Sequence, residues 1–275
     1  MAQHPALSSG NVAVITGGAD GIGLAAAHRY QSLGLSVCIA DIDADKLAAA
    51  AAALGDVLTV VADVSQLSEV ENIREQAYQR YGRVDVLMNN AGVARPTDSW
   101  SSYDAWKATI EVNLWGVING VHAFVPAMIG QETPGLIINT GSKQGITTPP
   151  GNPAYNVSKA GVKAVTEALQ HNLRTTEGCQ LSAHLLVPGF TYTGMIKPFL
   201  PELPKGAWTP EQVVEFLLEA LAKNEFYILC PDNDCTREID NKRMAWAMGD
   251  LIEQRPPLSR WHPDYEAEFA AFMED

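Results

Sequence analysis

The sequence predicts an α/β protein built on a doubly wound, parallel sheet of seven strands with helices on both faces, followed by a C-terminal helical tail. From residue 11 onward, short runs of β-branched and apolar residues alternate with longer runs of helix-forming residues. Several of the short runs are apolar almost throughout, as in strands that are covered on both faces. The expected strands are 12–16, 36–40, 58–62, 84–88, 135–139, 182–187 and 226–230, and the expected helices are 22–33, 44–54, 67–81, 103–128, 154–176 and 209–222.

The composition indicates a globular protein without a nucleic-acid partner. Hydrophobic residues make up 47% of the 275 residues and charged residues 19%, which excludes a disordered chain. The formal net charge of −13 repels phosphate backbones and anionic lipids. The four cysteines lack the paired spacing of a zinc site, and the N-terminus lacks the apolar core of a secretory signal. We therefore expect a reduced, cytoplasmic protein.

One stretch raises the alternative of a membrane span. Residues 112–131 contain no Lys, Arg, Asp or Glu and are long enough to cross a bilayer. They also contain Asn113, Asn119, His122, Pro126 and three glycines. These polar groups and helix breakers favour a buried or interfacial helix, so no membrane association is expected.

The C-terminal tail has its own pattern. We expect residues 1–235 to form a single domain and residues 236–275 to form a helical extension that packs on this domain or on a partner subunit. Apolar residues recur there at helical spacing in two groups. These are Met244, Met248, Leu251 and Ile252, and then Tyr265, Phe269, Phe272 and Met273, separated by an irregular segment over residues 255–263.

A glycine-rich motif follows the first expected strand. Residues 16–23 read Thr-Gly-Gly-Ala-Asp-Gly-Ile-Gly and open the first helix. Glycines at 17, 21 and 23 let the backbone turn tightly and approach a pyrophosphate, which the helix N-terminus would bind. An ordinary tight turn is the simpler reading of the glycines alone. Asp41 decides against it, because it ends the second strand eighteen residues after Gly23, where a carboxylate can accept both ribose hydroxyls.

The acidic residues of this motif favour NAD over NADP. Asp41 would repel a 2′-phosphate, and Asp20 inside the loop adds to that repulsion. Neither the loop nor residues 42–45 offer a Lys or Arg that could hold the phosphate. We therefore predict a Rossmann-type site for NAD.

A second group of residues predicts proton transfer. Tyr155 and Lys159 are four residues apart, so a helix presents both on one face. An adjacent ammonium, together with the positive nicotinamide ring, favours phenolate and lowers the pKa of a phenol from about 10 toward neutrality. Tyr155 is thus the expected acid or base. Ser142 follows the fifth strand, and its hydroxyl could stabilise charge on the substrate oxygen.

These motifs together resemble the classical short-chain dehydrogenase/reductase family from about Asn11 to Cys230. The spacing of the glycine motif and the Asn-Asn-Ala-Gly turn at 89–92 are typical of that family, with the catalytic order Asn113, Ser142, Tyr155 and Lys159. The resemblance implies that Asn113 holds a water linking Lys159 to solvent, and that Lys159 also bonds the nicotinamide ribose. It further implies that Asp63 and Val64 contact adenine and that residues 188–193 hold the nicotinamide carboxamide through Thr193. The expected cofactor-binding residues are Gly17, Asp20, Gly21, Ile22, Gly23, Asp41, Ile42, Asp63, Val64, Asn90, Ala91, Gly92, Tyr155, Lys159, Pro188, Gly189, Thr191 and Thr193.

The substrate pocket is expected at the segments that follow the catalytic strands. Its predicted residues are Arg95, Lys143, Gln144, Tyr192 and Met195, with a lid over residues 190–208. The apolar residues of the lid suggest a largely hydrophobic substrate. Arg95, Lys143 and Lys197 could steer an anionic group, although solvated surface charges are the simpler interpretation. The scattered histidines predict no metal site.

We thus expect an NAD-dependent oxidoreductase that interconverts a hydrophobic secondary alcohol, aryl-bearing alcohols included, and its ketone. Reduction of a 3-oxoacyl or steroid-like ketone is the alternative within enzymes. A non-catalytic dinucleotide sensor and an interaction scaffold are alternatives of another class. The resemblance also implies a homo-oligomer, a dimer or, less in keeping with the unusual C-terminus, a tetramer.

Overall fold

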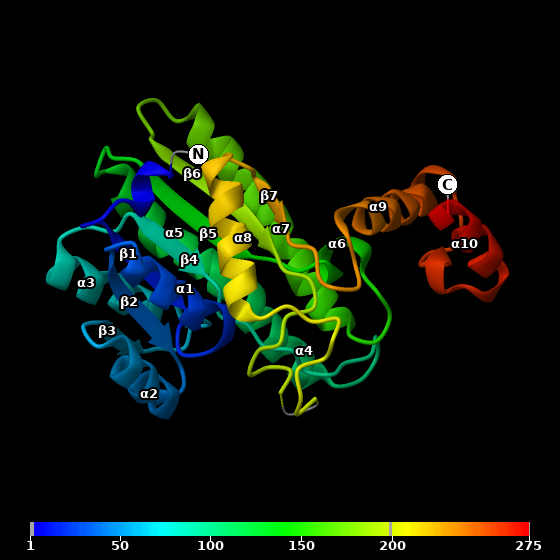
Figure 1. Cartoon of the computed structure of the whole chain (residues 1–275), viewed down its shortest axis with the longest axis horizontal. Coiled ribbons are helices and arrows are strands. Elements are labelled where there is room, and N and C mark those ends of the chain that lie inside the picture. Colours follow the sequence, from blue (N-terminus) through cyan, green and yellow to red (C-terminus); the bar gives the residue numbers. More distant parts are fainter. Residues whose placement is uncertain (1–2, 198–199, 275) are drawn as a thin grey trace.

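The computed structural model of the chain describes residues 3–197 and 200–274. Seven strands form one parallel sheet in the order β3-β2-β1-β4-β5-β6-β7 (Figure 1). The strands are β1 Val12–Thr16, β2 Ser36–Asp41, β3 Leu58–Val61, β4 Val86–Asn89, β5 Gly135–Thr140, β6 Leu181–Val187 and β7 Tyr227–Leu229. The predicted doubly wound parallel sheet is confirmed.

Helices cover both faces of the sheet. One hydrophobic cluster joins α1, α2 and α8 to one face, and a second joins α3, α5 and α7 to the other. The helices are α1 Gly21–Ser32, α2 Ala44–Leu54, α3 Leu67–Tyr81, α4 Tyr103–Ile110, α5 Gly116–Ile129, α6 Gln144–Thr147, α7 Pro153–Thr175, α8 Pro210–Ala222, α9 Arg237–Ile252 and α10 Glu266–Glu274. Short 3₁₀ turns occur at Pro5–Leu7, Ser259–Trp261 and Pro263–Tyr265.

The helix expected over residues 103–128 is interrupted. A π-helical turn, Glu111–Trp115, separates α4 from α5 without breaking the run. Such turns occur often at functional sites. The combined segment Tyr103–Ile129 is long and apolar enough to cross a membrane, yet its α5 part packs on β4 and α3. Asn119 donates from this helix to the carbonyl of Val64 at 2.9 Å, so a polar group inside it has a protein partner.

The tail extends away from the sheet. Helices α9 and α10 lie beyond α6, at the red end of the chain in Figure 1. The indole of Trp246 is the centre of the tail, with Phe269 and Phe272 each 5.2 Å from it between ring centroids. Its Nε1 donates to the hydroxyl of Ser259 at 2.8 Å, and the guanidinium of Arg255 lies 3.9 Å over its ring. The tail therefore has a small core of its own.

A buried chain of amides joins the sheet to α7. Asn89 of β4 donates to Asn139 of β5 at 2.8 Å, and Asn139 donates to the hydroxyl of Thr166 at 3.0 Å. All three side chains are buried. Because buried polar groups are costly to leave unpaired, this chain fixes α7 against the centre of the sheet.

Replacing Asn139 with Ala should destabilise the protein by about 2–3 kcal/mol, because the amide of Asn89 would lose its acceptor and Thr166 its donor. Urea unfolding measures this. Asn172→Ala, at the exposed end of α7, is the matched control and should change the free energy of unfolding by less than about 0.5 kcal/mol. Equal effects of the two substitutions would show that the amide chain contributes nothing specific.

Candidate active site

The candidate site lies where the carboxyl ends of β1, β4, β5 and β6 meet. The strand order reverses between β1 and β4, and the connections from these two strands leave on opposite sides of the sheet. Such a switch point opens a crevice at the carboxyl edge of a parallel sheet. The glycine motif follows β1, the Asn-Asn-Ala-Gly turn follows β4, and Ser142 follows β5.

The glycine loop packs backbone to backbone on the turn after β4. A Cβ added to Gly17 (φ +62°) would lie 2.7 Å from the Cα of Ala91, and one added to Gly23 would overlap the carbonyl oxygen of Gly17. Asn90 closes this contact by donating to that same carbonyl at 3.1 Å. The glycines thus present backbone near the start of α1, where the carboxylate of Asp20 caps the helix. A dinucleotide pyrophosphate fits such a surface.

Asp41 and Asp20 have partners that the sequence did not predict. Asp41 ends β2 and accepts from the backbone of Ala19 at 3.3 Å, so its carboxylate lies against the glycine loop. Asp20 caps α1, and its carboxylate pairs with Lys46 Nζ at 3.0 Å. The glycine loop and residues 42–45 contain no Lys or Arg, but a cation from the next residue reaches this edge. Lys46, the first residue past the segment 42–45, partly offsets the repulsion expected from Asp20.

The segment after β6 lies against the same loop. A Cβ added to Gly21 would lie 3.0 Å from the Cγ2 of Thr193. The backbone of Trp208 holds the base of the expected lid. Its N–H donates to the carbonyl of Phe190 at 2.8 Å, and its carbonyl accepts from the backbone N–H of Tyr192 at 2.9 Å. Residues 198 and 199 of this lid lie outside the described ranges. Thr193 is thus placed at the crevice, as its predicted role requires.

The remaining predicted cofactor residues divide by exposure. Ile42 is 67% exposed just past β2, where an adenine ring could cover it. Asp63 follows β3 and accepts from the backbone of Ser65 at 2.9 Å, while Val64 is buried under Gly116 of α5. Gly189 is closely packed, because a Cβ there would lie 2.6 Å from a carboxylate oxygen of Asp232. Thr191 is buried, and its hydroxyl donates to the carbonyl of Gly189.

Helix α7 carries Tyr155 and Lys159 on one face. Asn152 caps this helix by accepting from the backbone of Tyr155 at 3.4 Å. Lys159 is buried, and its Nζ donates to the carbonyl of Thr140 at 2.8 Å, at the end of β5. The same Nζ lies 5.7 Å from the centre of the Tyr155 ring. The helix therefore fixes the phenol and the ammonium side by side.

The pKa values of these two groups are shifted by burial. Burial raises the pKa of Tyr155, and its hydrogen bond with Ser142 acts in the opposite direction. Burial lowers the pKa of Lys159 to about 8. The contact with Ser142 therefore favours phenolate at Tyr155. The lysine is half-neutral near pH 8, which suits it to proton transfer as well as to hydrogen bonding.

Asn113 lies in the π-helical turn and uses its side chain to hold the backbone after β4. Its amide donates to the carbonyl of Val93 at 2.9 Å and to Ser158 at 3.1 Å, and its Oδ1 accepts from the backbone of Val93 at 2.7 Å. A Cβ on Gly92 would lie 3.4 Å from this Oδ1 and 3.7 Å from Lys159 Nζ. Because the side chain is committed to protein partners, a water bound by Asn113 would use its backbone carbonyl.

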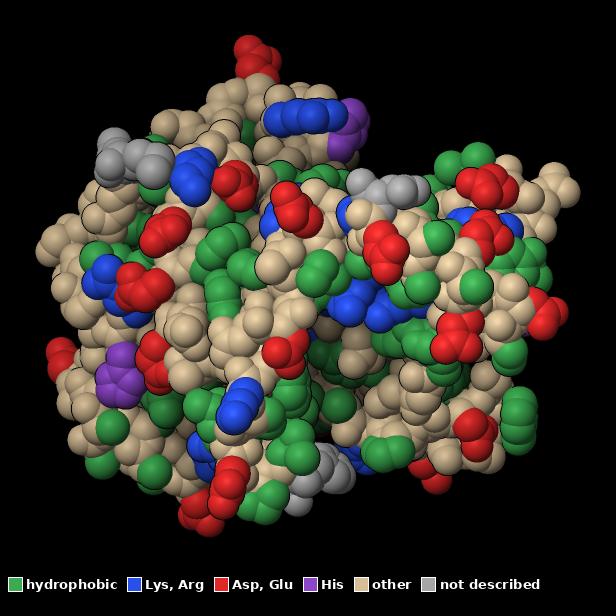
Figure 2. Space-filling model, turned by 45° about the vertical axis from the view of Figure 1, so that its right-hand side comes forward, with side chains coloured by type: hydrophobic (Ala, Val, Ile, Leu, Met, Phe, Trp, Pro, Cys, Tyr) green, Lys and Arg blue, Asp and Glu red, His purple; other side chains and the backbone are tan. Residues whose placement is uncertain are grey.

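The predicted substrate residues differ in their surroundings. Arg95 and Gln144 are exposed and Met195 is half-buried. Tyr192 donates to the carbonyl of Pro201 at 2.6 Å. For Lys143 the reading as a solvated surface charge is wrong, because its Nζ pairs with Asp232 at 3.3 Å and with Asp240 at 2.7 Å and is largely buried. A space-filling view shows a hollow between the main body and the tail, with Lys and Arg side chains in it (Figure 2).

No metal cluster accompanies these residues. Within residues 3–197 and 200–274, no three His, Cys, Asp or Glu side chains are grouped so that they could hold a metal ion. Buried thiols are likewise not activated: burial raises the pKa of Cys38 and of Cys230 to about 12. The acid–base groups of the described site are therefore the phenol, the hydroxyl and the ammonium.

The lowered pKa of Lys159 predicts a pH-dependent stability. The unfolded chain keeps this proton up to about pH 10.5 and the folded chain only up to about pH 8, so stability should rise with pH between these values. Lys159→Met removes the titrating group. In urea unfolding at pH 7 to 10, the wild type should gain stability relative to this variant as the pH rises. Parallel pH profiles would contradict the shifted pKa.

Comparisons with known proteins agree with this geometry. A family model described as short chain dehydrogenase matches residues 11–203. The chain is 32% identical over 261 residues to a 1-deoxy-11-beta-hydroxypentalenate dehydrogenase of Streptomyces exfoliatus, covering 90% of this chain and 93% of the relative. It is 35% identical over 234 residues to the 3-oxoacyl-[acyl-carrier-protein] reductase FabG of Thermotoga maritima, covering 80% and 93%. A short chain dehydrogenase/reductase of Burkholderia phymatum, solved in complex with NAD, superposes with a TM-score of 0.83 at 32% identity, covering 94% of this chain and 98% of that one. The chain therefore belongs to the short-chain dehydrogenase/reductase family.

Proposed function

We propose that the protein is an NAD-dependent oxidoreductase that interconverts a secondary alcohol with a hydrophobic substituent, aryl groups included, and the corresponding ketone. The observation that carries this proposal is the placement of Tyr155 and Lys159 on one face of α7, with Ser142 close enough to the phenol to lower its pKa. These groups lie at the edge of the sheet that also carries the glycine loop.

In alcohol oxidation, Tyr155 accepts the proton of the substrate hydroxyl. Ser142 donates a hydrogen bond to the substrate oxygen and keeps it in line with the phenol. Lys159 supplies the positive charge that favours phenolate, and Thr140 holds its Nζ in place. NAD, which the glycine loop and Asp41 would hold, would supply the hydride acceptor for the carbinol carbon. Ketone reduction uses the same groups with Tyr155 as the acid.

Asp41 supports NAD as the cofactor. Its carboxylate lies at the end of β2 against the glycine loop, in position to accept hydrogen bonds from two ribose hydroxyls. It would repel a 2′-phosphate at the same place. The related structure solved with NAD supports the same assignment. The pairing of Lys46 with Asp20 leaves Asp41 as the acidic group that discriminates.

Asp41→Ala should weaken NAD binding by about tenfold or more, because a charge-assisted pair of hydrogen bonds is lost. NADP binding should be unchanged or tighter. Quenching of tryptophan fluorescence by each cofactor measures both affinities. Asp43→Ala, which removes a cap of α2, is the control, because the carboxylate of Asp43 accepts from the backbone of Asp45 and Lys46, and the backbone N–H that Asp43 donates to Asp41 is kept in the variant. NADP preferred by the wild type would overturn the assignment of NAD.

Reduction of a 3-oxoacyl substrate remains the second candidate, since the relative from Thermotoga maritima bears that activity in its name. The two candidates differ in the substrate and in the direction of the reaction. Oxidation of secondary aryl alcohols with NAD, compared with reduction of a 3-oxoacyl thioester, separates them directly.

We also propose a cytoplasmic homo-oligomer. Trp115 of the π-helical turn is 52% exposed and Val157 of α7 is 49% exposed, so both central helices present apolar side chains outward. Burial of such side chains between two copies is a common basis for dimers. Sedimentation of the wild type and of Trp115→Gln tests this pairing, and an unchanged oligomer in the variant would exclude this face.

Tyr155→Phe tests catalysis against a sensor or scaffold. We expect the rate of alcohol oxidation to fall about 10²- to 10⁴-fold, because the proton acceptor is lost, while NAD affinity changes little. Steady-state absorbance of the reduced nicotinamide gives the rate. Tyr103→Phe, at a 79% exposed position of α4, is the matched control. Full activity in Tyr155→Phe would remove the phenol from the mechanism.

A further inference from the structure

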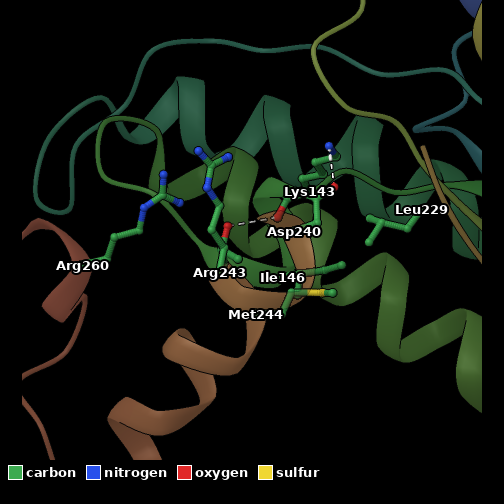
Figure 3. A pocket seen from close by; sticks show the side chains of 8 residues that line it. Lys143, Ile146, Leu229, Asp240, Arg243, Met244 and Arg260 are labelled. Atoms are coloured by element: carbon green, nitrogen blue, oxygen red, sulfur yellow. Dashed lines mark hydrogen bonds and ion pairs between the residues drawn. The ribbon is translucent and has the colours of Figure 1, made fainter. Parts of the chain in front are cut away.

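The tail brings two arginines to a cavity beside α6. Arg243 lies on α9 and Arg260 in the 3₁₀ turn Ser259–Trp261, and both line a cavity of about 50 Å³ together with Ile146 and Thr147 of α6. Their guanidinium groups lie side by side and point the same way, although they come from different elements (Figure 3). The cavity is large enough for a group of a few atoms.

Neither guanidinium is matched by a carboxylate. Arg243 donates to the sulfur of Cys235 at 3.0 Å, which is a weak acceptor. Arg260 lies over the rings of Trp261 and Phe269, at 4.7 and 5.4 Å. Among the described residues, neither arginine forms an ion pair. Arg255, in the same tail, contrasts with them because it bonds Asp250 at 3.1 Å and the carbonyl of Trp246 at 2.7 Å.

The cavity is a positive site in an acidic chain. Lys143 and Asp240 also line it, and these two form an ion pair with each other. Even when Asp232, the second partner of Lys143, is counted, three cations face two carboxylates. The pKa of Arg260 is lowered by burial and by the nearby charge of Arg243. An anion between the two guanidinium groups would relieve this repulsion and accept their free N–H donors.

Helix α6 separates this cavity from the catalytic residues. It follows Ser142 directly, and a Cβ on its Gly145 would lie 2.5 Å from the backbone of Lys159. Ile146 and Thr147 of the same turn line the cavity on the side of α9. A group bound there is therefore separated from Tyr155 by about the 10 Å diameter of one helix. A single extended substrate can span that distance.

We propose that Arg243 and Arg260 bind a carboxylate of the substrate, so that the preferred alcohol is a hydrophobic hydroxy acid with its carboxylate remote from the carbinol carbon. A planar carboxylate matches the guanidinium fork and fits the small cavity. The tail thereby takes part in substrate selection. This inference rests on the proposed function and specifies its substrate class.

A binding experiment tests the anion site without catalysis. The probe is biphenyl-4-carboxylate, titrated calorimetrically into the NAD-loaded protein, with biphenyl-4-carboxamide as the neutral counterpart. The wild type should bind the carboxylate at least about tenfold more tightly than the amide. Arg243→Gln and Arg260→Gln should each remove that preference. Arg237→Gln, which removes the same charge from an exposed position of α9, should retain it. No preference in the wild type, or a preference that survives both substitutions, would overturn the inference.

An activity experiment separates this inference from the proposed function. The two substrates are 4′-(1-hydroxyethyl)biphenyl-4-carboxylate and its carboxamide, which place two rings between the reacting carbon and the anion. The carboxylate should have the lower KM, and Arg243→Gln or Arg260→Gln should raise that KM about tenfold or more with little change in kcat. Equal turnover of both substrates would overturn the anion site and leave the oxidoreductase standing. Turnover of neither substrate, with the binding preference intact, would leave the anion site standing and overturn the proposed oxidation of these alcohols.

Folding of the variants is checked independently. NAD affinity, followed by tryptophan fluorescence, should be unchanged in both Gln variants, because the cavity lies beyond α6 from the glycine loop. Arg243→Lys and Arg260→Lys keep the charge and lose the fork, so they should retain part of the preference for the carboxylate. Lys variants that behave like the Gln variants in binding but lose NAD affinity would point to a purely structural role of the tail and overturn the proposal.

Discussion

The close contact between the glycine loop and the turn after β4 is the constraint on which the site depends. Gly17, Gly23 and Asn90 meet so closely that an additional carbon atom at either glycine would collide with backbone. This contact forms the bottom of the crevice at the switch point of the sheet and leaves the N-terminus of α1 facing outward. Asp41 and Thr193, which are proposed to contact the dinucleotide, are then positioned relative to one backbone surface.

The catalytic residues are tied to this surface from the other side of the reversal. The amides of Asn89 and Asn139 connect β4 to β5 and reach Thr166 of α7, so the helix that carries Tyr155 is fixed to the strand next to the glycine loop. Lys143 extends the same connection to the tail, because its ammonium joins the segment after β5 to Asp232 and to Asp240 of α9. A shift of the tail would therefore displace Lys143, the residue that follows Ser142.

The sequence allowed the sheet and its order of elements to be predicted, because these depend on local periodicity, and its short motifs identified side chains that the structure brings to one edge of the sheet. It did not allow the π-helical turn to be predicted, since Asn113 is held by Val93, whose backbone is fixed by the turn after β4. The partners of Lys143 could not be predicted either, because Asp232 is 89 residues away in the chain. Periodicity in the tail showed which side chains are apolar, and gave no sign that Arg243 and Arg260 come together.

Two features that cost free energy lie near the candidate site. Lys159 is buried with a single carbonyl partner recorded for its ammonium, and the π-helical turn interrupts an otherwise regular helix. Both features cost free energy, and the rest of the molecule compensates through two large apolar clusters and the buried hydrogen bonds that join Asn89, Asn139 and Thr166. A methionine of similar length would pack there at lower cost, so a buried lysine agrees with the role proposed for its charge beside Tyr155. The stability of the sheet is thus what permits a phenol and an ammonium to be held together away from water.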